Sequence, residues 1–259
     1  MTMKKSLFAV LLAGIAFTSS TMAATQVRLG VNPGYAPFEY KKPDGSLAGF
    51  DIDLGKEICK RMDADCTWVE SDFDGLIPAL KAKKMDAILS SMSITPARQK
   101  QINFSDKLYG TPARLITANK VTLKPTVKSL KGKRVGVFQG TTAETYAKQM
   151  WAKQGVDVVT YQSQDIVYAD LVNGRLDAAF QDAVAASDGF LNRPVGKDFH
   201  FSGPEVNDPE YFGVGAGIGV RKADTELLAK INKALAAMHK DGTYQAIAKK
   251  YFDFDIYGG

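Results

Sequence analysis

The chain has 259 residues, which is enough for one large domain or two modest ones. Apolar residues make up 45% and charged residues 24%, so a disordered chain, a coiled coil and a collagen-like fibre are excluded. The 33 lysines and arginines exceed the 28 aspartates and glutamates by only five. Because this surplus is small and spread along the chain, the charge does not indicate nucleic acid or a membrane surface as a partner.

The first 23 residues have the pattern of a Sec-type signal peptide. Lys4 and Lys5 precede an uncharged apolar run at residues 6–17, and small or polar residues then lead to Ala23. The run has about 12 residues, which is short of the roughly 20 that cross a bilayer. We therefore predict cleavage after Ala23 and export of a mature chain that begins at Ala24. An uncleaved membrane anchor is the alternative.

Cys59 and Cys66 are the only cysteines, with six residues between them. In an exported protein such a pair is expected to form a disulfide, because the compartment is oxidising. The chain-entropy model gives so short a loop about 2–3 kcal/mol of stabilisation. His200 and His239 lie far away in the sequence, so a zinc site would lack ligands and no metal is expected.

Strand and helix patterns alternate along the mature chain. In its first part, the patterns predict strands at residues 26–31, 67–69 and 87–89, a turn between two short strands at 43–45, and helices at 51–61 and 76–82. In its second part, they predict strands at 134–137, 156–161 and 178–180, and helices at 142–153, at 165–173 and from Asp182. This alternation is typical of parallel sheets covered by helices on both faces.

Residues 84–89 and 175–180 are similar in sequence, and each segment follows an amphipathic helix. Two similar α/β halves are therefore predicted, with a chance match of two short strands as the alternative. The tail predicts a strand at 216–220 and helices at 224–240 and 243–250, which could return to the first half.

Motifs for catalysis or for a cofactor are missing from the sequence. There is no Gly-x-Ser-x-Gly elbow and no Walker loop. The glycines at 213, 215, 217 and 219 do not have the dinucleotide-binding spacing, so they indicate a flexible connection or a close approach of backbones. No cofactor is expected, and the chain is predicted not to be an enzyme.

Several residues could together bind an amino acid, which carries a carboxylate and an ammonium. Arg98 can donate two parallel hydrogen bonds to the carboxylate. Thr141 and Thr142 lie at a helix start, where free amides favour an anion. Asp182 follows a strand and could accept from the ammonium. The alternatives are a solvated helix arginine for Arg98 and simple helix caps for the other three.

Other residues could complete such a site. Tyr35 and Phe73 could enclose a side chain between their rings, although Phe73 could instead belong to the core. Ligands of open α/β sheets collect at the carboxyl ends of strands. Such ends are occupied by Ser90, Ser91, Ser93 and Asp182.

The chain resembles the polar amino-acid family of periplasmic solute-binding proteins over essentially all of its mature length. Within the family it is most similar to the lysine/arginine/ornithine- and histidine-binding members. The motifs that carry the resemblance are Tyr35-Ala36-Pro37-Phe38, residues 49–54, 76–80, 90–95 with Arg98, 104–106, 132–137, 241–244 and 249–254, and the cysteine spacing.

The resemblance implies the two-lobed α/β fold of type II periplasmic binding proteins. Each lobe should be a mainly parallel sheet flanked by helices, with two crossing strands as the hinge, near residues 110–114 and 207–211. The implied division is a signal peptide at 1–23, lobe 1 at 24–110 and 212–259, and lobe 2 at 111–211.

The resemblance also implies roles for individual residues. Arg98 holds the ligand carboxylate, helped by Ser93 and Thr142, while Asp182 and Ser91 hold the α-ammonium. Further residues implied to contact the ligand or line the cleft are Tyr35, Phe73, Ser90 and Phe138.

Asn32 departs from the family pattern, because cation-binding members usually carry an acidic residue at this position. Asn32 can accept a hydrogen bond but brings no charge, and Asp51 could partly replace the missing acid. The expected ligand is a basic amino acid, namely arginine, lysine, ornithine or histidine. A polar uncharged amino acid is the alternative.

The resemblance implies an inner-membrane ABC importer as the partner. The protein itself is expected to be a monomer located in the periplasm. Two other functions stay open at this point. The first is a periplasmic dehydratase on the same scaffold, which could use carboxylates such as Glu39 or Asp51. The second is a sensory protein that reports its ligand to a membrane receptor.

Overall fold

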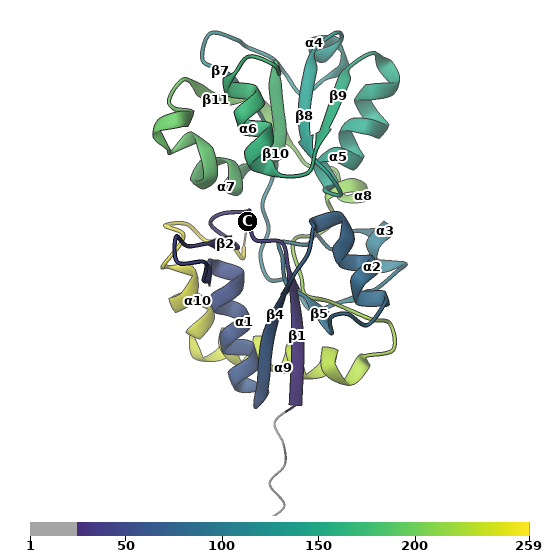
Figure 1. Ribbon diagram of the computed structural model, residues 1–259, viewed down its shortest axis with the longest axis vertical. Helices are drawn as coiled ribbons and strands as arrows, with labels where there is room; N and C mark the ends of the chain where they lie inside the picture. Colours follow the sequence, from purple (N-terminus) through teal and green to yellow (C-terminus); the bar gives the residue numbers. More distant parts are fainter. Residues whose placement is uncertain (1–24, 259) are drawn as a thin grey trace, which may run out of the picture.

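A computed structural model describes residues 25–258 of the chain (Figure 1). The predicted signal peptide and its cleavage site lie outside the described residues. Two five-stranded sheets follow one another along the long axis of the molecule, each with its own helices. We call them the first unit, at the bottom of Figure 1, and the second unit, at the top.

The first unit combines strands from both ends of the chain. Its sheet has the order β4 (Ala64–Glu70), β1 (Thr25–Val31), β5 (Ala87–Ile88), β12 (Gly219–Val220) and β6 (Asn103–Phe104). β1 pairs in parallel with β4 and β5, whereas β12 is antiparallel to β5 and β6. A small hairpin joins β2 (Tyr40–Lys41) to β3 (Leu47–Ala48).

The second unit repeats this arrangement. Its sheet has the order β11 (Phe199–Val206), β7 (Ala113–Ala118), β10 (Ala178–Asp182), β8 (Arg134–Phe138) and β9 (Asp157–Tyr161). β8 is parallel to β9 and β10, whereas β7 is antiparallel to β10 and β11. In both sheets four strands share one direction and the second strand from one edge is reversed, so the prediction of two similar, mainly parallel halves is confirmed.

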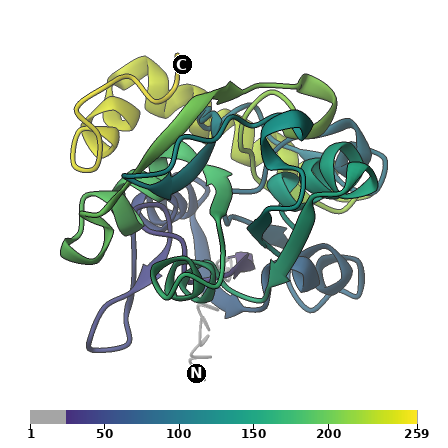
Figure 2. The same ribbon diagram turned by 90° about the horizontal axis from the view of Figure 1, so that it is seen from above.

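Helices flank both sheets. In the first unit they are α1 (Phe50–Arg61), α2 (Leu76–Lys81), α3 (Pro96–Gln99), α9 (Thr225–Asp241) and α10 (Thr243–Ala248), with a 3₁₀ turn at Phe73–Gly75. In the second unit they are α4 (Val127–Leu130), α5 (Thr142–Tyr146), α6 (Gln164–Val172), α7 (Ala183–Ala186) and α8 (Pro209–Phe212), with π-helical turns at Ala147–Trp151 and Ser187–Leu191 and 3₁₀ turns at Ala152–Gln154 and Pro194–Gly196. Seen from above, the C-terminal helices, drawn in yellow, lie to one side of the second sheet (Figure 2).

Neighbouring residues of one strand belong to different cores, which shows that helices cover both faces of each sheet. Ala87 packs in the cluster that contains α1, whereas Ile88 packs with α2. In the second unit, Phe180 belongs to the cluster with α5 and Ala179 to the cluster with α6. These alternating contacts are expected for a strand buried on both faces.

The predicted helix at 51–61 is confirmed as α1, and it places one charged residue in the interior. Ile52, Leu54 and Ile58 are buried at helical spacing. Asp51, in the first turn, is also fully buried, although carboxylates are rarely buried without partners. α1 therefore brings a carboxylate to the inner end of the first unit.

The predicted helix at 142–153 is interrupted. The chain forms α5, then the π-helical turn at Ala147–Trp151 and a 3₁₀ turn. The wider π turn allows Trp151 to enter the core, where its ring is 4.7 Å from that of Phe180.

The predicted strand at 216–220 is shorter than expected, because only Gly219–Val220 is a strand. Just before this segment, Gly213 and Gly215 have φ of 73° and 123°, in the region that favours glycine. A Cβ atom on Gly213 would be 1.9 Å from the carbonyl oxygen of Ile94. Close approach of two backbones therefore explains this part of the glycine run.

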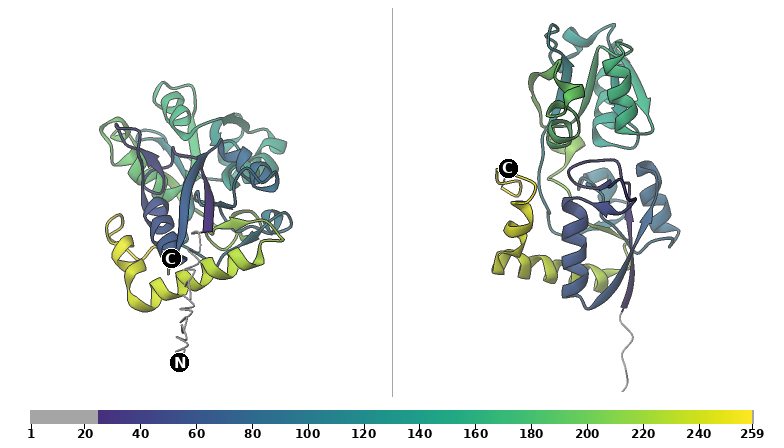
Figure 3. Two further views of the ribbon diagram at one scale, coloured as in Figure 1. Left: turned by 60° about the horizontal axis from the view of Figure 1, so that its bottom comes forward. Right: turned by 60° about the vertical axis from the view of Figure 1, so that its left-hand side comes forward.

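The two connections between the units run along one side of the molecule (Figure 3, right). Residues 110–112 lie outside any helix or strand and lead into β7. The prediction of a crossing strand near 207–211 is wrong, because α8 begins at Pro209. Asp208 caps this helix by accepting a hydrogen bond from the Glu210 N–H, and proline favours the first helical position.

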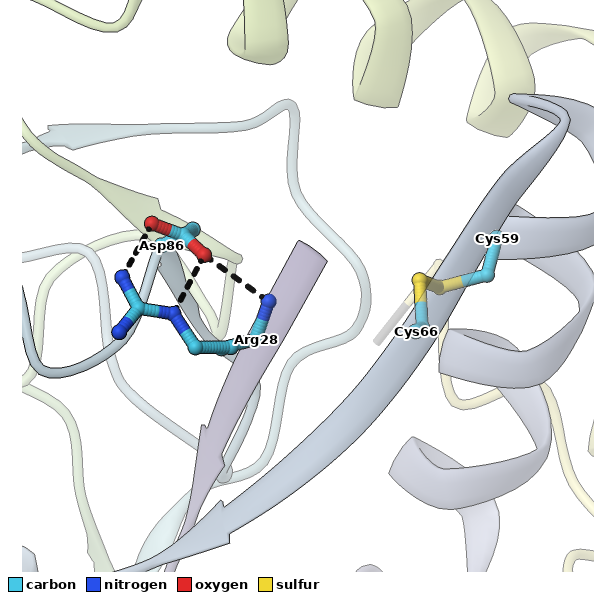
Figure 4. Close-up of a disulfide and its surroundings, with 4 residues drawn as sticks. All are labelled: Arg28, Cys59, Cys66 and Asp86. Atoms are coloured by element: carbon cyan, nitrogen blue, oxygen red, sulfur yellow. Dashed lines mark hydrogen bonds and ion pairs between the residues drawn. A yellow bond between two sulfur atoms is a disulfide. The ribbon is translucent and has the colours of Figure 1, made fainter. Parts of the chain in front are cut away.

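The predicted disulfide between Cys59 and Cys66 is present and connects the end of α1 to β4 (Figure 4). On the neighbouring strand β1, Arg28 forms an ion pair with Asp86, with 2.9 Å between Nε and Oδ2. The disulfide therefore fixes α1 to the edge strand of the first sheet.

We predict that replacing both cysteines with alanine lowers the free energy of unfolding by about 2–3 kcal/mol, because the unfolded chain loses its constraint. Urea unfolding of the oxidised protein, of the reduced protein and of the double variant measures this. The reduced protein serves as the control and should resemble the double variant. Equal stability of oxidised and reduced protein would contradict the prediction.

Candidate ligand-binding site

A cavity of about 610 Å³ lies between the two units. Its volume is typical of a small-molecule site. The sequence-predicted residues that line it are Asn32, Tyr35, Phe73, Ser91, Ser93, Arg98, Phe138, Thr141, Thr142 and Asp182. Asp51 and Ser90 do not line it and lie fully buried nearby, where they bond to residues of its wall.

The order of the strands places this cavity. In the first sheet the chain passes from β1 to β4 on one side and then to β5 on the other, and in the second from β8 to β9 and then to β10. Ligands of such sheets bind where the strand order reverses, beyond the carboxyl ends. Asn32 and Ser90 follow β1 and β5, and Phe138 and Asp182 end β8 and β10.

Arg98 spans the two units. Thr95 caps α3 by accepting a hydrogen bond from the Arg98 backbone N–H at 3.2 Å. This cap fixes the start of the helix that carries the Arg98 side chain. The guanidinium donates to the carbonyl oxygens of Ser93 at 3.1 Å and Gly140 at 3.0 Å, and its carbon lies 5.5 Å from the centre of the Phe73 ring. Arg98 is therefore not a solvated helix arginine. Burial lowers the pKa of Arg98 to about 10, so it remains a cation at neutral pH.

Gly140 permits this contact between the units. Its φ is 78°, and a Cβ atom there would be 2.8 Å from the Cβ of Asp74. The neighbouring Gln139 side chain donates a hydrogen bond to the Asp74 carboxylate. The two units are therefore in direct contact on this side of the cavity.

The two threonines at the start of α5 differ in the hydrogen bonds of their hydroxyl groups. The Thr141 hydroxyl caps the helix by accepting from the Glu144 N–H at 3.2 Å, and it donates to the carbonyl oxygen of Phe138. Thr141 is therefore a helix cap at the cavity wall. The Thr142 hydroxyl makes no hydrogen bond to any other described residue and also borders the cavity.

Asp182 caps α7 and also lines the cavity. One carboxylate oxygen accepts from the Ala185 N–H at 2.9 Å, and the other accepts from the Thr111 hydroxyl. Burial raises the pKa of Asp182 to about 7. The cap interpretation is therefore correct, and it leaves a carboxylate at the cavity.

Glu39, which the sequence indicated only as a possible carboxylate of a dehydratase, joins the predicted site residue Asp51 in a buried network. Glu39 accepts from the hydroxyls of Ser90 and Ser91, both at 3.0 Å. Asp51 accepts from the Ser91 N–H and the Tyr109 hydroxyl, both at 2.8 Å. Burial raises the pKa of both carboxyls, and the charge of Asp51 raises that of Glu39 further.

Two glutamines of the second unit were also missed. Gln164, at the start of α6, and Gln181, on β10, line the cavity and are at most 3% exposed. Both amide atoms of Gln164 and the amide oxygen of Gln181 have no partner among the described residues. A buried polar atom without a hydrogen bond lowers the stability of the fold unless a ligand or a water molecule bonds to it.

Asn32 offers one acceptor to the cavity. Its amide nitrogen donates to the carbonyl oxygen of Ser71 at 2.9 Å, and its backbone N–H donates to the Ser90 hydroxyl at 2.9 Å. In the part of the chain that the structure describes, no group donates to its amide oxygen.

Aromatic rings from both units border the cavity. Phe138 of the second unit lies 5.8 Å from Phe73 and 6.4 Å from Tyr35 of the first unit, between ring centres. Phe73 also belongs to a core cluster with α2, so it is both a core residue and a cavity residue.

Residues 25–258 contain no group of three or more His, Cys, Asp or Glu side chains that could hold a metal ion. Within the same range, every helix is too short or too polar to cross a membrane.

Comparison with known proteins identifies close relatives. The family model of the bacterial extracellular solute-binding proteins, family 3, matches residues 27–254. The histidine-binding periplasmic protein of Escherichia coli K12 is 58% identical over 249 residues, which are 95% of this chain and 96% of that protein. The lysine/arginine/ornithine-binding periplasmic protein of the same strain is 58% identical over 259 residues, which are 99% and 100% of the two chains.

Solved structures agree with the fold. The structure of an ancestral arginine-binding protein bound to arginine has a TM-score of 0.81 and 36% sequence identity, and the match covers 88% of this chain and 98% of that one. The two-lobed α/β architecture implied by the sequence is therefore confirmed.

The buried carboxylates predict an unusual dependence of stability on pH. The pKa of Asp182 is about 7 in the folded chain and about 3.9 in the unfolded chain. This difference lowers the free energy of unfolding progressively as the pH rises from about 4 to 7. Glu39 and Asp51 act in the same direction. The pKa values of Asp86 and Asp241 are about 2, so their stabilisation is constant above about pH 5.

We therefore predict that the melting temperature of the ligand-stripped protein falls by about 5 °C or more between pH 5 and pH 8. Calorimetric melting curves measure this fall. Asp182→Asn should reduce it, because asparagine keeps the helix cap but does not ionise. A melting temperature that rises steadily over the same interval would contradict the prediction.

Proposed function

We propose that this chain, which belongs to the bacterial extracellular solute-binding proteins of family 3, captures a basic L-amino acid in the periplasm and delivers it to an inner-membrane ABC importer. The observation that carries this proposal is the cavity shared by Arg98 of the first unit and Asp182 of the second. A cation on one unit and a carboxylate on the other complement the two charges of an amino acid.

The relatives support the ligand class. Two relatives at 58% identity are named for binding histidine and for binding lysine, arginine and ornithine. These relatives are binding proteins and not enzymes. We therefore propose that the chain binds its ligand without turnover and needs no cofactor.

The proposed pose follows from the positions of the side chains. Arg98 binds the ligand carboxylate with the N–H groups that Ser93 and Gly140 do not use, and Thr142 adds a hydroxyl. The carboxylate of Asp182 and the hydroxyl oxygen of Ser91 accept hydrogen bonds from the α-ammonium of the ligand. The ligand side chain then extends between Tyr35 and Phe73.

The two units act as lobes that close on the ligand. We propose lobe 1 at residues 24–110 and 212–259 and lobe 2 at 111–211, which agrees with the strands of each sheet. Hinge closure is the motion of periplasmic binding proteins, and a ligand shifts it only by its higher affinity for the closed state. The closed contact of Arg98 with Gly140 is one that ligand binding would favour.

Export and assembly complete the proposal. The signal peptide at residues 1–23 is cleaved after Ala23, and the mature protein works as a monomer. The periplasmic location of the relatives supports export.

Calorimetric titration of the mature, ligand-stripped protein tests the function. We expect arginine, lysine, ornithine or histidine to bind at least tenfold more tightly than glutamine. The reason is that several carboxylates line the cavity, whereas the side chain of glutamine carries no charge. Tighter binding of glutamine would assign the chain to polar uncharged amino acids instead.

Arg98→Lys tests the pose. It keeps the charge but loses the planar pair of donors, so affinity should fall about thirtyfold or more, as expected when a buried charged contact is broken. Arg114→Lys is the matched control, because Arg114 bonds to Gly203 on β11 and does not line the cavity. Equal affinities of the Arg98 and Arg114 variants would show that Arg98 does not bind the carboxylate.

A further inference from the structure

Two glutamine side chains of the second unit carry buried polar atoms without partners. Gln164 and Gln181 both line the cavity, although they are only 3% and 2% exposed. Both amide atoms of Gln164 and the amide oxygen of Gln181 make no hydrogen bond to any described residue. Buried amides are normally bonded, because an unpaired amide lowers the stability of the fold. These atoms are therefore expected to bond to a group in the cavity.

The fold places the two amides on one wall of the second unit. Gln164 is the first residue of α6, whose start is fixed by the Ser163 hydroxyl, which accepts from the Ile166 N–H. Tyr168 lies one helical turn further along, on the same face of α6. Its hydroxyl accepts a hydrogen bond from the amide nitrogen of Gln181 on β10. The amide oxygen of Gln181 is therefore the atom that remains for a ligand.

The Tyr168 ring holds this arrangement in place. It stacks on the Phe190 ring, with 4.4 Å between the ring centres and 6° between the ring planes. Tyr168 is buried in the same core cluster as Phe190. Because its hydroxyl is fixed, the amide of Gln181 is fixed as well, and a fixed acceptor costs less entropy when it binds a donor.

The wall formed by the two amides faces the first unit near Tyr35. Burial raises the pKa of the Tyr35 hydroxyl well above its usual range, and Asp182 and Tyr168 raise it further. Such electrostatic effects require short separations, so Tyr35 lies close to both residues across the boundary between the units. In the proposed pose the ligand side chain passes the Tyr35 ring, which directs it toward the two amides.

The two amides have no role in holding the charged ends of an amino acid. In the proposed pose, Arg98 binds the ligand carboxylate and Asp182 binds the ammonium. A ligand with only these two polar groups would leave Gln164 and Gln181 without partners. An amide oxygen accepts hydrogen bonds, so it complements a side chain that ends in N–H donors, such as a guanidinium, an ammonium or an imidazole.

We propose that Gln164 and Gln181 form a specificity-determining subsite on the second unit, where their amide oxygens accept hydrogen bonds from the N–H groups at the far end of the ligand side chain. Water in the cavity can serve the remaining amide nitrogen of Gln164. This inference rests on the proposed function, since it assumes that the ligand is an amino acid held at its other end by Arg98 and Asp182.

Titration of Gln164→Met with the tightest-binding basic amino acid and with norleucine tests this subsite. Methionine is close to glutamine in length but offers no strong hydrogen bond. Norleucine has the carbon chain of lysine without the terminal ammonium. We expect the variant to lose about tenfold in affinity for the basic amino acid and less than about threefold for norleucine, because only the former donates to Gln164.

Gln245→Met is the matched control, because Gln245 is exposed on α10 and does not line the cavity. It should change neither affinity. The melting temperature of ligand-free Gln164→Met should not fall below that of the wild type, because the variant buries no unpaired amide. A lower melting temperature together with unchanged affinities would assign the amide a structural role and overturn the inference.

Two further results would also overturn the inference while the proposed function stands. Equal losses for both ligands would show that Gln164 only shapes the cavity, and an unchanged affinity for the basic amino acid would show that its side chain ends elsewhere. If the wild type bound no amino acid, the proposed function itself would fail.

A second variant decides the question if Gln164→Met does not fold. Gln164→Asn keeps the amide but shortens its reach by one methylene group. It should therefore show the same selective loss for the basic amino acid, and equal affinities of this variant and the wild type would contradict the subsite.

Discussion

Three carboxylates, those of the buried Glu39 and Asp51 and of the half-buried Asp182, lie around one cavity without a lysine or arginine paired to them in the described chain. Burying an ionised carboxylate costs several kcal/mol unless hydrogen bonds and a cation offset that cost. The fold supplies the hydrogen bonds, through Ser91 and Tyr109 in the first unit and through the capped helix α7 in the second. A cationic ligand would supply the remaining charge, so stability, closure and specificity all depend on the same groups.

The sheet topology explains why these groups meet. In the first unit β1 lies between β4 and β5, and in the second unit β8 lies between β9 and β10, so each sheet has neighbouring carboxyl ends at one edge. The two edges face each other across the cavity. Arg98 contacts the second unit through Gly140, and the acids lie elsewhere on the cavity wall. The cavity is therefore polarised in the way that an amino acid with a cationic side chain requires.

The sequence predicted the fold well where the physical signal was local. The apolar spacing of α1, the alternation of strands and helices, and the cysteine pair all correspond to observed elements. The helix at 209–212 was missed because the expected hinge strand took precedence over the cap at Asp208 and the proline after it. The interrupted helix at Ala147–Trp151 depends on tertiary packing of Trp151, which no local pattern reveals.

The site was only partly predictable for a similar reason. Arg98 and Asp182 follow recognisable helix and strand boundaries, whereas Glu39 lies in a turn and Gln164 at an ordinary helix start. Calorimetry of arginine binding in buffers of different ionisation enthalpy tests the central claim most directly, because it counts the protons released. Near pH 6.5, arginine should release protons and glutamine should release fewer. Equal proton release by the two ligands would contradict a cation-stabilised acidic wall.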